Sequence, residues 1–446
     1  MLWSKIKKQE MRNFIFLISA IFILQPLNAQ SLYFPPLTGS TWDTISPKTL
    51  GYCQTNIDRL YDFLEANNTR AFIILKNGKI VLEKYFGTHT QLTPWQWASA
   101  GKTITSFMVG MAQQEGFLSL DDTTSTYLGK GWTDCTPKQE EKITIKHQLS
   151  MNSGLDDKVL DHFCTIDTCL IYKADAGDRW AYHNGPYTLL DRVIEKATGQ
   201  TLNNYTTQKL KTPIGMTGSF IPVGYNNVYF STARSMARFG LLMLNKGKWG
   251  ENQIMADSIY FKQMVSPSQS LNKSYGYLWW LNGKQSYMLP TSQTMFPGYL
   301  NPNAPADMFV AMGKDGQFLN VIPGQQMVMV RMGEAPENLP VPFVLNDNIW
   351  KYVNELQCAT TAVEKPMNNE SMVQIFPNPS SDIIVIKSEK SIETVEILNI
   401  QGQKLKAAVF STKEVRMPVG EMQKGIYILQ AKMIDGSRWI GKFIKQ

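Results

Sequence analysis

The sequence has few of the residues that bind metal ions. Its 446 residues include four histidines and five cysteines, with neither a Cys-x-x-Cys pair nor the His/Cys spacing typical of zinc sites. We therefore expect no metal ion and no other cofactor, so any chemistry has to come from the side chains themselves.

Net charge is also lacking from most of the chain. The formal net charge is +7, but the first 30 residues hold four basic residues against one acidic residue. Residues 372–446 hold 11 Lys or Arg against 7 Asp or Glu. The residues between these ends are neutral overall, which argues against a nucleic-acid-binding surface there.

Long apolar runs are absent except for one near the N-terminus. Residues 14–24 are apolar apart from Ser19, follow a group of basic residues and precede Leu27-Asn28-Ala29. This run is too short to cross a bilayer comfortably, and the pattern is typical of a signal peptide. We expect a signal peptide over residues 1–29, with Met11 as an alternative start, and no stable membrane span.

Cysteines in an exported chain most simply form disulfides. Cys164 and Cys169 could close a short local loop, and Cys53 and Cys358 could join the two ends of the central region. Cys135 is then left over.

The central region combines strand-like and helical patterns. Apolar residues alternate on both sides of Asn77-Gly78 in residues 71–86, which predicts a β-hairpin. The spacing also predicts helices over residues 99–116, 187–197, 232–244 and 345–356, and strands over 306–313, 318–323 and 326–333. Strands begin and end the region, so the first hairpin can pair with the last strands in an α+β fold.

Ser99 and Lys102 stand at the start of the first predicted helix. Their spacing, Ser-x-x-Lys, recurs at Ser4–Lys7 and Ser270–Lys273, so the spacing alone identifies nothing. Residues three apart share one helix face, and a helix N-terminus favours developing negative charge. A serine beside a lysine whose pKa is lowered by burial is an arrangement suited to attack on an ester or amide.

Two further motifs follow in order, Tyr182-His183-Asn184 and Lys314-Asp315-Gly316. With the segments around them (143–156, 182–202, 230–249, 275–280 and 313–330), they resemble the serine β-lactamase and penicillin-binding protein superfamily, most closely its class C-like branch. The resemblance covers about residues 50–357. It implies a β-lactamase/transpeptidase-like domain, in which helices flank an antiparallel sheet beside a helical subdomain.

The resemblance also implies a metal-independent serine hydrolase. Ser99 would attack the substrate carbonyl and form an acyl-enzyme. Lys102 and Tyr182 would share the proton transfer, with Tyr182 kept partly ionised by Lys102 and Lys314. His183 is expected to be structural.

Substrate binding is assigned by the same resemblance. Asn184 would brace Lys102 or the substrate amide, and the backbone N–H groups of Ser99 and Gln317 would form the oxyanion hole. Where the family carries Lys-Thr-Gly, this chain has Lys314-Asp315-Gly316, and an aspartate in the cleft would repel a substrate carboxylate. We therefore expect an esterase, D-aminopeptidase or aminohexanoate-oligomer hydrolase. The alternatives are a class C-type β-lactamase or D-Ala-D-Ala carboxypeptidase, and a non-catalytic surface binding protein that keeps the fold.

The C-terminal region has a different pattern of apolar and polar residues. Residues 359–371 are polar and aperiodic, which predicts a linker after a hydrolase domain over 30–358. Alternating runs at 382–388, 394–400, 403–409, 425–433 and 438–445 predict a small β-sandwich over 372–446. The segments IFPNPSSDIIVI, ILNIQGQKL, GIYILQ and GKFIK resemble the sorting domain of the type IX secretion system. This implies the secretion machinery as a partner, and a secreted or cell-surface location reached via the periplasm; a carbohydrate-binding sandwich is the alternative.

Overall fold

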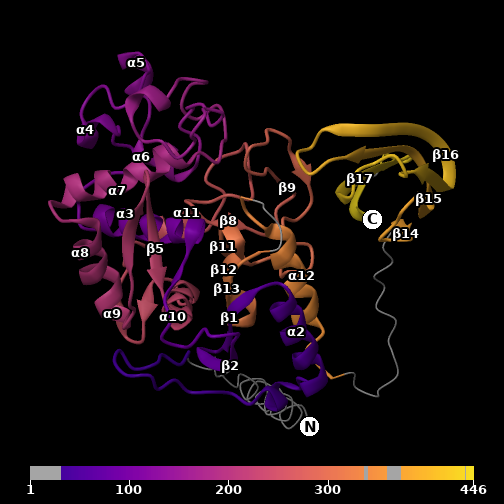
Figure 1. Ribbon diagram of the computed structural model, residues 1–446. Coiled ribbons are helices and arrows are strands. Elements are labelled where there is room, and N and C mark those ends of the chain that lie inside the picture. The colour runs from indigo at the N-terminus through magenta and orange to yellow at the C-terminus, as the bar shows by residue number, and fades with distance from the viewer. Residues whose placement is uncertain (1–31, 336–339, 359–372, 437) are drawn as a thin grey trace, which may run out of the picture.

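A computed structural model describes residues 32–335, 340–358, 373–436 and 438–446 (Figure 1). The predicted signal peptide and linker both lie outside the described residues. Within the described ranges, no helix has the length and apolar character needed to cross a membrane.

The catalytic-domain candidate is built on one six-stranded antiparallel sheet in the order β2-β1-β13-β12-β11-β8. The strands are β1 (Thr69–Lys76), β2 (Lys79–Tyr85), β8 (Trp280–Leu281), β11 (Phe309–Gly313), β12 (Gln317–Ile322) and β13 (Met327–Gly333). The hairpin predicted at Asn77-Gly78 is confirmed, and so is the pairing of that hairpin with the last strands. In the register of β1 and β13, Ile73 lies opposite Val330.

Helices cover both faces of this sheet (Figure 1). The helices α2 (Gln54–Ala66) and α12 (Phe343–Asn354) pack together on one face, and α10 (Ala233–Leu244) packs on the other. The predicted helix at 232–244 is confirmed, with Thr232 as its N-cap accepting the N–H of Ser235. These layers account for the expected α+β, β-lactamase/transpeptidase-like fold.

A helical subdomain lies beside the sheet. Its two long helices are α3 (Lys102–Gln114) and α7 (Asn184–Thr198). The shorter helices are α4 (Ser125–Leu128), α5 (Pro137–Glu140), α6 (Ile145–Leu149), α8 (Leu202–Thr206), α9 (Thr212–Ile214) and α11 (Ser258–Met264). A small sheet of β3 (Trp95–Gln96), β4 (Ser219–Val223) and β5 (Asn226–Ser231) supports them, and β6 (Lys248–Trp249), β7 (Asn252–Gln253), β9 (Ser286–Tyr287) and β10 (Phe296–Pro297) form two short ladders.

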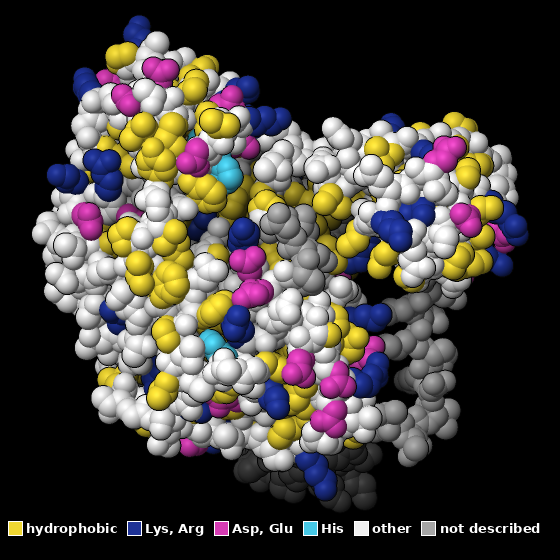
Figure 2. All heavy atoms as spheres, viewed as in Figure 1, with side chains coloured by type: hydrophobic (Ala, Val, Ile, Leu, Met, Phe, Trp, Pro, Cys, Tyr) yellow, Lys and Arg dark blue, Asp and Glu magenta, His cyan; other side chains and the backbone are white. Residues whose placement is uncertain are grey.

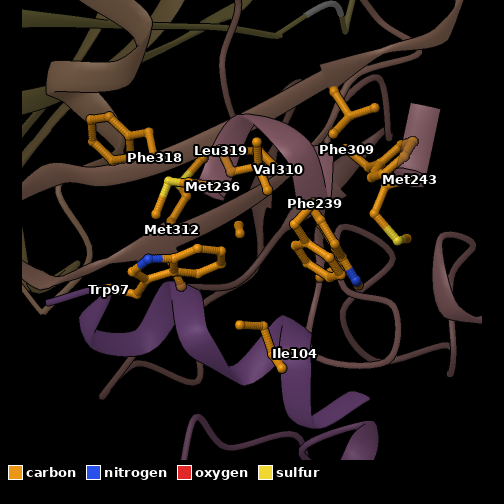
Figure 3. Close-up of a cluster of buried hydrophobic side chains, with 14 of the residues drawn as sticks. Trp97, Ile104, Met236, Phe239, Met243, Phe309, Val310, Met312, Phe318 and Leu319 are labelled. Carbon is orange, nitrogen blue, oxygen red and sulfur yellow. The ribbon is translucent and has the colours of Figure 1, made fainter. Parts of the chain in front are cut away.

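Helix α3 is central, since every residue from Lys102 to Ala112 is buried. A helix that is buried on all sides belongs to the interior of a domain. Figure 3 shows Trp97, which precedes this helix, facing Met312 of the sheet and Met236 of α10, with Ile104 of the helix in the same buried cluster. The N-terminal end of α3 is therefore fixed against the sheet by apolar packing.

Two disulfides form as expected, Cys53–Cys358 and Cys164–Cys169, and Cys135 is free. Cys53 is the residue before α2, and the N–H of Cys358 donates to the carbonyl of Gly51 at 2.8 Å. The first bridge thus joins the two ends of the domain at the base of the paired helices α2 and α12.

Replacing Cys53 and Cys358 together by serine should lower the free energy of unfolding by roughly 2–5 kcal/mol, because the bridge closes a loop of 305 residues. The double replacement of Cys164 and Cys169, which are only five positions apart, is the control and should cost less. Urea denaturation of the two variants measures both losses. Equal losses would contradict the loop-length argument.

The C-terminal region forms a curled five-stranded sheet with its own core, consistent with the expected β-sandwich (Figure 1). Its strands are β14 (Val373–Phe376), β15 (Ile383–Leu398), β16 (Lys404–Pro418), β17 (Gly425–Met433) and β18 (Arg438–Lys445). The prediction of two separate strands at 382–388 and 394–400 is wrong, because both belong to the single strand β15. Between them the ladders are irregular, but Ile392 pairs with Thr412 of β16 and Met433 of β17, so the strand continues instead of turning back.

Candidate active site

Ser99 lies in a 3-10 turn, Ala98–Gly101, directly before α3. The helix was expected to start at Ser99 itself, but it begins at Lys102. Ala98 has a positive φ of 44°, which is strained for a residue with a side chain, and strain of this kind is concentrated at functional sites. Trp97 anchors the turn, because its indole N–H donates to Ser231 Oγ at 2.8 Å and its backbone N–H to Tyr229 O at 2.8 Å.

Lys102 connects the turn to the helical subdomain. Its Nζ atom lies 2.8 Å from Ser99 Oγ and 2.8 Å from Asn184 Oδ1, and 4.1 Å from the ring centre of Tyr187. The side chain is only 3% exposed. Burial lowers the pKa of Lys102 to about 7, against an opposing effect of the Asp191 carboxylate, so a large fraction of the amine is neutral at pH 7.

Tyr182 is the third residue that the structure brings to Ser99. Its hydroxyl group is hydrogen-bonded to the Ser99 side chain, and its ring stacks on Trp280 at 5.7 Å. Burial raises the pKa of Tyr182 well above 10. The expectation that Tyr182 is partly ionised is therefore wrong, since the apolar surroundings disfavour a phenolate and the side chain of Lys314 is exposed to solvent.

The third motif occupies a hairpin turn between β11 and β12. Lys314, Asp315 and Gly316 connect the two strands, and Asp315 has a positive φ of 62°. The strand predicted over 306–313 ends at Gly313 as β11 does, so the motif follows the strand and forms the turn. Asp315 is half-buried and Lys314 is exposed, so the turn stands at the rim of the site.

Gly313, the last residue of β11, lies against the nucleophile. A β-carbon at this position would come within 2.4 Å of Trp97 O, 2.9 Å of Ala100 N and 3.1 Å of Ser99 N. Only glycine allows this approach of strand and turn. Gly313 was not predicted as a site residue, although a glycine at the end of a strand-like run was a usable signal.

β11 pairs with β8 at Phe309 and Val310, and the residues that follow them run past Ser99. Asn282 donates its N–H to the carbonyl of Met308, so the backbone groups of even-numbered residues on this strand face away from β12. Continuing the alternation directs the N–H of Lys314 to the same edge.

Gln317 was predicted as an oxyanion-hole residue, but it starts the inner strand β12 and pairs with Gly313. Its side-chain amide is bonded to both the N–H and the carbonyl of Gly333. The same alternation directs the N–H of Gln317 at its partner Gly313, which argues against Gln317 as an oxyanion-hole donor.

Arg331 is fully buried and hydrogen-bonds to the hairpin turn between β11 and β12. Its guanidinium group donates five hydrogen bonds, to Asp315 O, Gly316 O, Thr69 Oγ1, Asn67 O and Glu334 O, at 2.6–3.0 Å. Nothing in the sequence singled out this residue except that it is the one charge in an apolar strand.

Metal-binding clusters were searched for among the residues that the structure describes, and no group of three or more His, Cys, Asp or Glu side chains is suitably arranged. His183, between Tyr182 and Asn184, is buried, and burial lowers its pKa to about 4. It is therefore neutral across the physiological range.

A serine held 2.8 Å from a buried lysine, with a tyrosine beside it at the edge of an antiparallel sheet, defines the class of serine β-lactamase-like proteins. Residues 65–354 match the Beta-lactamase family, and the chain belongs to it. Members of this family are typically serine hydrolases. Residues 374–446 match the secretion system C-terminal sorting domain.

Similar proteins match most of the region that matches the Beta-lactamase family. The chain is 25% identical to an uncharacterized protein of Alkalihalophilus pseudofirmus over 316 residues, which is 62% of this chain and 86% of that one. A putative 6-aminohexanoate-dimer hydrolase from Bacillus anthracis has a TM-score of 0.52 at 21% identity, covering 74% of this chain and 90% of its own. A family VIII carboxylesterase has a TM-score of 0.52 at 13% identity, covering 69% and 99%. At these identities the two structures establish the fold alone.

Proposed function

We propose that this protein is an exported serine hydrolase that cleaves an ester or amide through an acyl-enzyme on Ser99. The observation that carries the proposal is the contact of 2.8 Å between Ser99 Oγ and the buried amine of Lys102. An amine with a pKa of about 7 is a competent base at neutral pH, whereas an ordinary surface lysine is not.

The proposed reaction has two halves. Ser99 Oγ bonds to the substrate carbonyl carbon while its proton passes to Lys102, directly or through the hydroxyl of Tyr182. The oxyanion accepts hydrogen bonds from the N–H groups of Ser99 and Lys314. The tetrahedral intermediate then expels an alcohol or amine, which takes the proton, and water releases the acyl group from Ser99 by the same steps. Asn184 fixes the amine of Lys102 throughout.

Replacing Ser99 by alanine should abolish labelling by a fluorophosphonate probe and abolish turnover, with an unchanged unfolding midpoint. The loss is one oxygen atom at a half-exposed site, so little packing changes. Labelling is read by intact-mass spectrometry. The control is Ser106→Ala, because Ser106 is a fully buried serine on α3; this variant should keep full labelling. Persistent labelling of the Ser99 variant would end the assignment and favour the non-catalytic alternative.

The substrate we favour is a neutral ester or amide with an apolar group. The loop before Tyr182 exposes Leu160, Ile166 and Ile171. Figure 2 shows hydrophobic side chains on the surface of the helical subdomain, at the upper left. A pocket of about 350 Å³ is lined by this loop and Tyr225. The same loop contacts the site, because Gly185 donates its N–H to His162 O at 3.0 Å.

A substrate panel separates the candidate activities. It consists of p-nitrophenyl esters of increasing chain length, D-amino-acid anilides, linear aminohexanoate oligomers and the β-lactam nitrocefin. The negative charge of Asp315 at the rim of the site supports neutral substrates over carboxylate-bearing β-lactams. Preferential turnover of nitrocefin would instead favour the β-lactamase alternative.

We also propose that the sorting domain delivers the protein through the type IX secretion machinery to the cell surface or medium. Deleting residues 372–446 should leave an active hydrolase domain that accumulates in the periplasm, because the two regions have separate hydrophobic cores. Fractionation and labelling of the truncated protein measure both results. Normal export of the truncated chain would contradict the sorting role.

A further inference from the structure

A buried carboxyl group lies one helical turn below the catalytic lysine. Asp191 is 2% exposed and comes from α7, where it follows Asn184 by seven residues and Tyr187 by four. These three residues share one face of the helix. The face is directed at α3, because Asn184 binds Lys102 and Asp191 binds Thr105.

Two hydrogen bonds link α3 to α7: the first joins Lys102 to Asn184, and the second joins Thr105 to Asp191. Thr105 Oγ1 donates to Asp191 Oδ1 at 3.1 Å, and Asn227 Nδ2 donates to Asp191 Oδ2 at 3.1 Å. Lys102 and Thr105 are three residues apart on α3, so the lysine link and the aspartate link lie one above the other. The ring of Tyr187 lies between them, 4.1 Å from Lys102 Nζ.

The groups that face this pair come from several elements. Lys102 faces the uncharged rings of Tyr182 and Tyr187. Burial lowers the pKa of His162 in the loop above, and the charge of Lys102 lowers it further. Asp191 faces Lys102 and, along α7, Glu195. Burial raises the pKa of Asp191 to about 7, against the hydrogen bonds from Asn227 and Thr105, so the carboxyl and the amine titrate in the same range.

We propose that Asp191 is a positioning residue that acts through Lys102: its carboxylate sets how readily the buried amine takes up a proton, and thereby the pH range in which Ser99 can be acylated. The inference rests on the proposed function. A negative charge stabilises the protonated amine, so removing it should favour the neutral amine. The catalytic base would then become available at lower pH.

The test is the pH dependence of fluorophosphonate labelling of Ser99 in the full-length protein. The acid limb is the part of the pH profile in which the labelling rate rises with pH. In Asp191→Asn this limb should lie roughly one pH unit lower than in the wild type. Asp191→Glu, which keeps the charge, should restore the limb toward its wild-type position. The control is Asp347→Asn, since Asp347 is a buried carboxylate on α12 held by Asn303, and its loss should leave the limb unmoved.

An unmoved limb in Asp191→Asn would overturn the proposal, as would an equal movement in Asp347→Asn. If Asp191→Asn does not fold, Asn227→Leu replaces it, because losing this donor makes Asp191 easier to protonate; the limb should move in the same direction, and an unmoved limb overturns the proposal there too. Wild-type protein that is not labelled at Ser99 would instead refute the proposed function.

Discussion

Replacing Lys102 by methionine should lower the rate of Ser99 labelling by roughly 10²–10⁴-fold, the usual contribution of a general base. Methionine fills a similar volume but cannot accept the proton of Ser99 Oγ, to which the lysine amine is bonded at 2.8 Å. The rate is measured with a fluorophosphonate probe across the pH range. In the wild type it should rise through pH 7, near the pKa of Lys102, and this rise should be absent from the variant.

The same variant should be more stable than the wild type at neutral and acidic pH. Burial lowers the pKa of Lys102 from 10.5 to about 7, so below pH 7 the folded state buries a charge that the unfolded state keeps in water. The cost is about 3–5 kcal/mol, from roughly 1.4 kcal/mol per pKa unit. Between pH 7 and 10.5 only the unfolded state binds the proton, so this cost declines as pH rises.

Urea denaturation at pH 6, 8 and 10 measures this effect. The stability difference between Lys102→Met and wild type should be largest at pH 6 and should shrink toward pH 10. Lys209→Met, at a partly exposed lysine paired with Glu115, is the control and should show no such decline. A stability difference that does not depend on pH would mean that burial does not lower the pKa of Lys102.

Replacing Arg331 by methionine should lower the free energy of unfolding by about 3–5 kcal/mol, as is typical when one partner of a buried charged network is removed. The five hydrogen bonds of Arg331 satisfy four backbone carbonyls and one hydroxyl, and the variant leaves these acceptors unpaired in the interior. Arg331→Lys should rescue little, because a single ammonium group cannot reach acceptors on all sides.

The control is Arg70→Met, because Arg70 forms a partly exposed ion pair with Glu334 at 2.7 Å. Its loss should cost less than about 1 kcal/mol. Chemical denaturation compares the two. The labelling rate of Arg331→Met should also fall below that of Arg70→Met, since Arg331 supports the turn that follows Gly313. Similar stability losses in both variants would argue against a special role of the buried guanidinium group.

The sequence predicted those parts of the fold that have a local signal. Asn77-Gly78 marked a hairpin because both residues tolerate the backbone of a tight turn, and the apolar period located α7, α10 and α12 to within a few residues. Ser99, Lys102, Tyr182 and Asn184 were predicted as a group, and the structure brings them together.

The parts that the sequence did not predict depend on register and burial. The sequence left Lys314, Asp315 and Gly316 between two predicted strands, but only the register of β11 and β12 shows which backbone groups face the site. The ionisation of Tyr182 was misjudged for a related reason, because a pKa depends on packing by Trp280 and other residues far along the chain. Arg331 and Asp191 resembled ordinary solvated charges until the structure showed them buried.

The pairing of β1 with β13 also governs when the candidate site can form. Ile73 and Val330 are partners in the central sheet although more than 250 residues separate them, so the sheet cannot close until nearly the whole domain has been synthesised. Pairings this distant slow folding, because the chain loses loop entropy before the contacts form. A chain that still lacks residues 327–333 therefore has no complete central sheet, and the candidate site around Ser99 cannot form before these residues are present.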